Sequence, residues 1–221
     1  MKKVFFFNSF YILFIIIFFT IHNAPSFSEG YTSLKIPVTN FKKIKAISSN
    51  VNYYSLQTED DKKFIRAYYK PPLKTVTLRT ELPATTGTYS KLSWKWRVLK
   101  FPVGADERVK GRRDSAGAVY CIFREGSYNY TVKYVYSSAM PVSTIIKEHS
   151  LLGKMYVVVI NSRINAEKGQ WIKEEVNFKE DFKRLFKTKE VPSLQYIAIM
   201  TDGDGTKSEV ITDYADFIIL P

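Results

Sequence analysis

The sequence predicts an all-β protein: an antiparallel two-sheet jelly-roll sandwich with one short amphipathic helix near residues 178–188. Three observations predict this fold. Short segments in which apolar and polar side chains alternate recur along the chain, as is typical of half-buried strands. Only one segment has helical spacing, whereas an α/β fold needs helices between most of its strands. Many short strands with a single helix favour two packed antiparallel sheets.

About nine segments are predicted to be strands. The clearest, residues 92–98, places Trp94 and Trp96 on one face and Lys95 and Arg97 on the other. In chain order the predicted strands cover residues 64–69, 75–82, 92–98, 116–124, 128–137, 155–161, 171–178, 194–201 and 209–220.

The predicted helix follows the strand at 171–178. Phe182, Leu185 and Phe186 recur at the spacing of one helical face. Asn177 is a suitable N-cap, acidic residues follow it in the first turn, and basic residues fill the last turn, which suits the helix dipole.

The first 28 residues are expected to be a secretory signal peptide. Two lysines precede a nearly unbroken apolar run from Val4 to Ile21, and small residues at Ser26 and Ser28 precede Glu29. This is the order of regions in a cleavable signal, although an apolar run of this length also allows an uncleaved anchor. We therefore expect a periplasmic or secreted protein, with residues 29–221 as a single β-sandwich domain and membrane contact only through the signal.

The remaining 31 basic and 21 acidic residues leave residues 29–221 with a net charge of +10. Such a charge favours encounter with anionic polymers and lipid headgroups without specifying one of them. Because an exported protein seldom meets nucleic acid, we expect no nucleic-acid partner.

The sequence offers little catalytic machinery. Cys121, the only cysteine, lies in an apolar strand and is expected to be a packed side chain rather than a nucleophile. His149 is the only histidine after the signal and is expected in a polar loop. No Gly-rich phosphate loop follows a strand. We assign no catalytic residue, and we favour a binding protein over an enzyme.

Four carboxylates near the end of the sequence are the candidate metal ligands: Asp202, Asp204, Asp213 and Asp216. The first two lie in the Gly-rich segment Thr201–Thr206, directly after a predicted strand. Oxygen ligands at this spacing suit a hard cation, so a structural calcium ion is the one cofactor considered. Two alternatives stay open: a tight turn in which the aspartates bond backbone N–H groups, and a pair of carboxylates for glycoside hydrolysis.

The candidate ligand-binding residues are aromatic and basic: Tyr128, Tyr130, Tyr134, Tyr136 and Arg97. The tyrosines alternate along one face of the strand at 128–137. Tyrosine tolerates a half-wet surface because its ring is apolar and its tip polar. They therefore line a sugar-binding face or cover one side of the core.

Several of these segments resemble one bacterial secreted family, catalogued as domain of unknown function three thousand and forty-seven. The resemblance runs from about Phe64 to Ile219 and rests on a Trp-x-Trp-Arg strand, a Trp-x-x-Glu strand before the helix, and a Met-Thr-Asp-x-Asp turn. It implies a sugar-binding-like jelly roll in the bacterial periplasm and no established activity. Two acidic or polar positions that are frequent in the family are absent here, beside Asp114 and at Gly205, which weakens a metal or catalytic interpretation.

Three functional hypotheses follow. The first is a non-catalytic module that binds a glycan or another anionic envelope component. The second is a polysaccharide hydrolase or lyase that uses the carboxylates of residues 202–216. The third is a purely structural envelope protein.

Overall fold

The computed structural model describes residues 32–44, 52–83, 87–150, 153–164 and 169–221. The predicted signal peptide lies outside the described residues. Within them, no helix is both long and apolar enough to span a bilayer.

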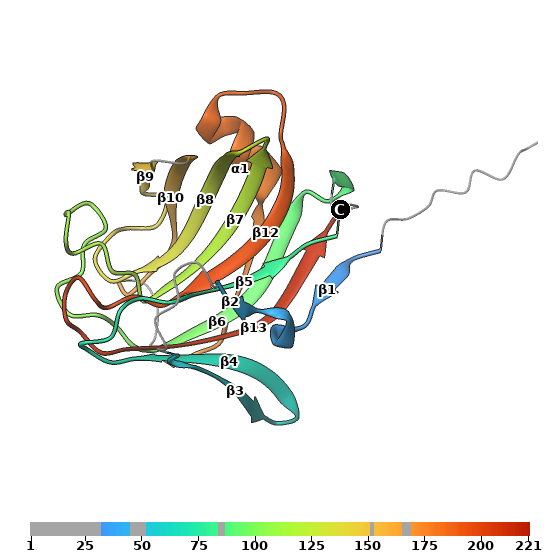
Figure 1. The fold of residues 1–221 in the computed structure, drawn as a ribbon. Coiled ribbons are helices and arrows are strands. Elements are labelled where there is room, and N and C mark those ends of the chain that lie inside the picture. The colour runs from blue at the N-terminus through green and yellow to red at the C-terminus, as the bar shows by residue number, and fades with distance from the viewer. Residues whose placement is uncertain (1–31, 45–51, 84–86, 151–152, 165–168) are drawn as a thin grey trace, which may run out of the picture. The chain divides into compact units, whose positions relative to one another are not determined.

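Over the described residues the fold is all-β, as the sequence predicts, and consists of two sheets and one α-helix (Figure 1). Sheet A, with six strands, has the order β11 (Ile172–Asn177), β6 (Lys91–Lys100), β13 (Val210–Leu220), β4 (Lys62–Tyr69) and β3 (Tyr54–Glu59), with β1 (Leu34–Ile36) on β13. Sheet B, with seven strands, has the order β2 (Lys42–Lys43), β5 (Thr77–Glu81), β12 (Ser193–Met200), β7 (Gly117–Glu125), β8 (Tyr128–Ser137), β10 (Gly153–Ser162) and β9 (Ile145–Ser150). A short 3₁₀ helix, η1 (Val38–Asn40), follows β1.

One strand pair departs from the antiparallel expectation. β8 and β10 are parallel. The strand between them in the sequence, β9, lies at the edge of the sheet and is antiparallel to β10, which lies between β8 and β9. His149 lies in β9 rather than in the loop that the sequence suggested.

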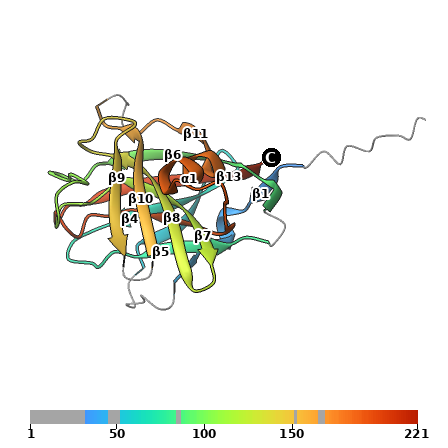
Figure 2. The same cartoon turned by 90° about the horizontal axis from the view of Figure 1, so that it is seen from above.

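The helix α1 (Phe178–Phe186) forms where its pattern predicts and ends two residues earlier than expected. The Asn177 side chain accepts a hydrogen bond from the Glu180 backbone N–H at 3.0 Å, which is the predicted N-cap. Lys187 ends the helix in a left-handed conformation. Viewed from above, α1 lies by β6 of sheet A and β8 of sheet B (Figure 2), where Phe182 packs 4.6 Å from Phe123 between ring centres.

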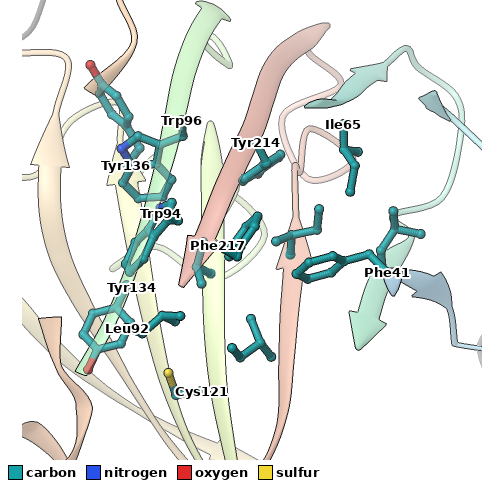
Figure 3. Packing of buried hydrophobic residues seen from close by; sticks show 14 of the residues in the cluster. Phe41, Ile65, Leu92, Trp94, Trp96, Cys121, Tyr134, Tyr136, Tyr214 and Phe217 are labelled. Atoms are coloured by element: carbon teal, nitrogen blue, oxygen red, sulfur yellow. The ribbon is translucent and has the colours of Figure 1, made fainter. Parts of the chain in front are cut away.

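The core lies between the inner faces of the two sheets and is rich in aromatic rings. Trp94 and Trp96 of β6 are fully buried. Each packs on a tyrosine of β8, with ring centres 6.0 Å apart for Trp94 and Tyr134 and 5.5 Å apart for Trp96 and Tyr136 (Figure 3). The free thiol of Cys121 is also buried in this layer, and burial raises its pKa, as expected for a packed side chain.

Candidate functional site

The tyrosine face of β8 points into the core. Tyr134 and Tyr136 are 0% and 1% exposed, and the Tyr134 hydroxyl donates a hydrogen bond to the Asp181 Oδ2 at 2.9 Å. The tyrosines share one face of the strand, as predicted, but this face packs on the tryptophans of sheet A. Tyr134 and Tyr136 are therefore core residues, which corrects their assignment as ligand-binding side chains.

The other two tyrosines lie at the start of β8. Tyr128 is partly exposed and packs against Tyr130, which is half-buried. Tyr130 packs in turn on Phe186 of α1 and lines a cavity of about 370 Å³. These two remain accessible to a ligand.

Arg97 lies on the outer face of sheet A and is engaged by the protein itself. Its Nε donates to the Asp213 Oδ2 at 2.7 Å, and its Nη1 pairs with the Glu59 Oε2 at 2.8 Å. The guanidinium also lies 4.5 Å from the ring centre of Trp171 and 5.2 Å from that of Phe64. With its side chain only 12% exposed, Arg97 holds the sheet surface together and is not free for a ligand.

The four predicted metal ligands do not form one site. Asp213 is buried in sheet A between Arg66 and Arg97, at 2.7 Å from the Nε of each. Asp216 lies on the outer face of the same sheet and pairs with Lys95 at 2.8 Å. Arg66 of β4 and Arg97 of β6 lie opposite Asp213 in the strand register, whereas Asp216 follows Ala215, the register partner of Lys95. Basic neighbours neutralise both carboxylates, and both are excluded from the predicted metal set.

Asp202 and Asp204 lie in the loop between β12 and β13 and meet a third carboxylate, that of Asp114, which is not among the predicted ligands. One carboxylate oxygen of each of Asp114, Asp202 and Asp204 lies within 4.8 Å of the others. In the sequence, Asp114 is marked only by its place beside a departure from the family pattern. Nothing in its spacing predicts the contact, which depends on β7 and β12 being neighbours.

The aspartate cluster is tied to its loop by hydrogen bonds. Asp114 accepts the backbone N–H groups of Gly205 and Thr206 at 3.1 and 2.6 Å, and Asp202 accepts the Thr75 hydroxyl at 2.6 Å. The turn alternative is therefore present in the structure, with the loop bonded to Asp114 as well as to its own aspartates. Burial, followed by the neighbouring Asp114 and Asp204 carboxylates, raises the pKa of Asp202 to about 6, against the opposing bond from Thr75.

The outer face of sheet A holds a cavity of about 750 Å³, within the size range of roughly 300–1,000 Å³ for small-molecule sites. It lies where β4 pairs with the first half of β13 and β1 with the second half. A register shift in β13 between Ala215 and Ile218 separates the two halves. Asp216, in the shifted segment, has a positive φ of 54°, which is uncommon for a residue other than glycine.

Among the described residues, four lysines and one carboxylate, Asp216, line this cavity: the lysines are Lys35 on β1, Lys63 on β4, Lys95 on β6 and Lys173 on β11. They are far apart in the sequence, so no local motif reveals them. The one available signal was the outward position of Lys95 on the strand whose other face carries the tryptophans.

A smaller cavity of about 290 Å³ adjoins the first and shares Lys63, Lys95 and Asp216 with it. Trp171, partly buried just before β11, and Phe64 line it together with Lys62 and two further carboxylates, Glu59 and Asp60. We call the two cavities together the basic cleft.

A family model described as "Protein of unknown function (DUF3047)" matches residues 39–218. The chain belongs to this family. The resemblance inferred from the sequence is therefore confirmed, and no curated protein matches this DUF3047 chain.

Solved structures similar to this DUF3047 protein have distant sequences. The xyloglucanase domain of NopAA, a type three effector from Sinorhizobium fredii in complex with cellobiose, has a TM-score of 0.48 and 7% identity, over 86% of this chain and 96% of that one. Endoglucanase cel12A from Rhodothermus marinus has a TM-score of 0.45 and 8% identity, over 86% and 95%. A family 11 carbohydrate-binding module from Clostridium thermocellum, in complex with a beta-1,3-1,4-mixed-linked tetrasaccharide, has a TM-score of 0.44 and 8% identity, over 85% and 95%. Likeness at this level assigns no ligand to the DUF3047 chain.

The motifs that carry the DUF3047 resemblance take different places in the structure. The Trp-x-Trp-Arg strand contributes both the core tryptophans and Lys95 of the basic cleft. The strand that starts after Trp171 contributes Lys173, and the Met-Thr-Asp-x-Asp turn carries two members of the aspartate cluster.

Proposed function

We propose that the protein is exported to the periplasm or secreted and is a non-catalytic module that binds a glycan or another anionic component of the cell envelope. The features of the first 28 residues support export. The basic cleft on sheet A would hold the ligand.

The observation that carries this proposal is the unbalanced charge of the larger cavity. Lys95 is paired with Asp216, but Lys35, Lys63 and Lys173 have no ion-pair partner within the described part of the chain. Like charges that surround one hollow repel one another. An anionic ligand relieves this repulsion.

Changing Asp216 to Asn is expected to tighten the binding of an anionic glycan about threefold, because it removes the one carboxylate among the described residues that line the larger cavity and releases Lys95. Asparagine tolerates the left-handed backbone at this position. A gain of affinity cannot come from damaged folding, so the result is specific. Isothermal titration with galacturonic-acid oligomers, at two salt concentrations, measures it.

Two further variants complete this experiment. The triple change Lys35→Gln, Lys63→Gln and Lys173→Gln should weaken binding, whereas Lys110→Gln, an exposed lysine of the β6–β7 loop, should not. If the triple lysine variant and Lys110→Gln both bind the glycan as tightly as the original protein, the cleft is not the ligand site.

A structural calcium ion at Asp114, Asp202 and Asp204 is the second part of the proposal. Clustered carboxylate oxygens suit Ca²⁺, and their mutual repulsion is the reason why a cation would stabilise them. Bonds from the loop backbone already occupy Asp114, so the ion would rest mainly on the other two carboxylates.

Asp202→Asn tests the electrostatics of the aspartate cluster without calcium. A carboxyl whose pKa is higher in the folded than in the unfolded state stabilises the fold when protonated, and this contribution is lost as pH rises through about 6. At pH 7 the variant should therefore be more stable by up to about 2 kcal/mol. The gain should fade as pH falls from 6 to 4.

Urea unfolding across this pH range measures the effect, and thermal melts with calcium or EDTA test the ion. Calcium should raise the melting temperature of the original protein and not that of Asp202→Asn. An unchanged melt in both proteins rules out a calcium site.

A polysaccharide hydrolase or lyase is the second candidate function, favoured by the raised pKa of Asp202, which brings proton exchange near neutral pH. Asp213 and Asp216 no longer support it, since basic side chains bind both. Turnover of a bound glycan that Asp202→Asn abolishes would establish the enzyme. If no glycan binds and none is cleaved, the structural envelope protein remains.

A further inference from the structure

We propose that the basic cleft recognises an extended acidic polysaccharide rather than an isolated anion, with an acidic group in the larger cavity and a neighbouring sugar ring against Trp171 in the smaller one. This inference rests on the proposed function and specifies the ligand of the same site.

Trp171 is held in place for such a contact. The Arg97 guanidinium lies 4.5 Å from its ring centre, and the Phe64 ring meets it edge-on at 5.6 Å between centres. Arg97 is itself fixed by Asp213 and Glu59. Arg97 and Phe64 therefore fix the orientation of the indole, which also lines the smaller cavity. A preorganised aromatic ring binds a flat apolar face with little loss of conformational entropy.

The two cavities are continuous in their lining. Lys63, Lys95 and Asp216 belong to both, so a ligand that reaches from one to the other passes two lysines and one carboxylate. A single inorganic anion can occupy the larger cavity but cannot also contact Trp171. A chain of sugars with acidic groups satisfies both parts at once, since its rings offer apolar faces and its acids offer charge.

The other polyanions fit less well. Polyphosphate has the charge but no ring for Trp171. Single-stranded nucleic acid has rings and charge, but one aromatic platform beside a group of lysines gives it only one stacking contact.

The experiment uses the full-length protein and compares probes that carry negative charge, sugar rings, or both. We expect galacturonic-acid hexamers to bind more tightly than monomeric galacturonate, than cellohexaose, which is neutral, and than polyphosphate of equal charge. Trp171→Ala should weaken binding of the acidic hexamer about tenfold, the change that 1.4 kcal/mol produces, and leave polyphosphate binding unchanged. Trp171→Phe should restore part of the loss. The triple lysine variant should weaken both acidic probes, and Lys110→Gln should weaken neither.

The outcomes distinguish this inference from the proposed function. If the lysine variant loses binding but Trp171→Ala does not, the cleft binds anions and the ring contact is wrong. If the hexamer binds no better than the monomer, the extended ligand is wrong. If an oligothymidylate of equal charge binds more tightly than the acidic hexamer, the ligand class is wrong. If neither variant changes binding, both proposals fail. A melting temperature for each variant excludes a folding defect as the cause.

Discussion

Asp213→Asn is expected to lower the free energy of unfolding by about 3–5 kcal/mol, the usual effect of removing one partner from a buried ion pair. The Asp213 carboxylate is fully buried, and Arg66 and Arg97 both donate to it. Asparagine has the same shape but carries no charge, so two guanidinium groups would face each other across a neutral amide. Urea unfolding at pH 7 measures the loss.

Asp216→Asn is the matched control, because it removes a carboxylate of the same strand from an exposed pair. Both partners of the Lys95–Asp216 pair are more than a third exposed, and such pairs contribute about 1 kcal/mol or less. Equal effects from the two variants would mean that solvent reaches the Arg66–Asp213–Arg97 group.

Tyr134→Ala should also lower the free energy of unfolding by about 3–5 kcal/mol, as truncation of a buried aromatic does. Tyr134 is fully buried and packs on Trp94, so its removal opens a hole between the sheets. Binding of an acidic glycan to the protein that remains folded should not change, because the ring lies away from the basic cleft. Denaturant unfolding and a titration at low temperature measure the two quantities.

Tyr134→Phe separates the ring from its hydroxyl. It keeps the packing and loses only the hydrogen bond to Asp181, so it should cost about 1 kcal/mol. The opposite pattern, a stable Tyr134→Ala that no longer binds ligand, would place this tyrosine on a ligand face.

Alternation and helical spacing predicted the strands and the helix because these periods come from local backbone geometry. They also placed the tyrosines of β8 on one face. Alternation alone does not show which face of β8 points into the core, since β8 is buried on both sides over residues 132–137. That depends on the sheet that packs against it.

In the candidate sites too, local spacing predicted part of the arrangement, and the rest depends on which strands are neighbours. The spacing of Asp202 and Asp204 suggested a cluster, and the structure contains one, but the third member comes from another strand. The basic cleft was not predicted because its lysines lie on four strands that only the sheet order brings together. Pairs such as Arg66 and Asp213 are separated by 147 residues, and no local pattern reveals them.

The strand β1 has a consequence for how strongly the cleft can bind. It has three residues and, among the described strands, pairs with β13 alone, yet it supplies one wall of the larger cavity. Local opening costs less than global unfolding, so detachment of this short strand would cost mainly its pairing with β13 and the exposure of Ile36, which is buried in the core. The observed affinity then equals the affinity of the closed form multiplied by the fraction of molecules in which β1 is docked. Substitutions that loosen β1, far from any ligand contact, would weaken binding by lowering that fraction.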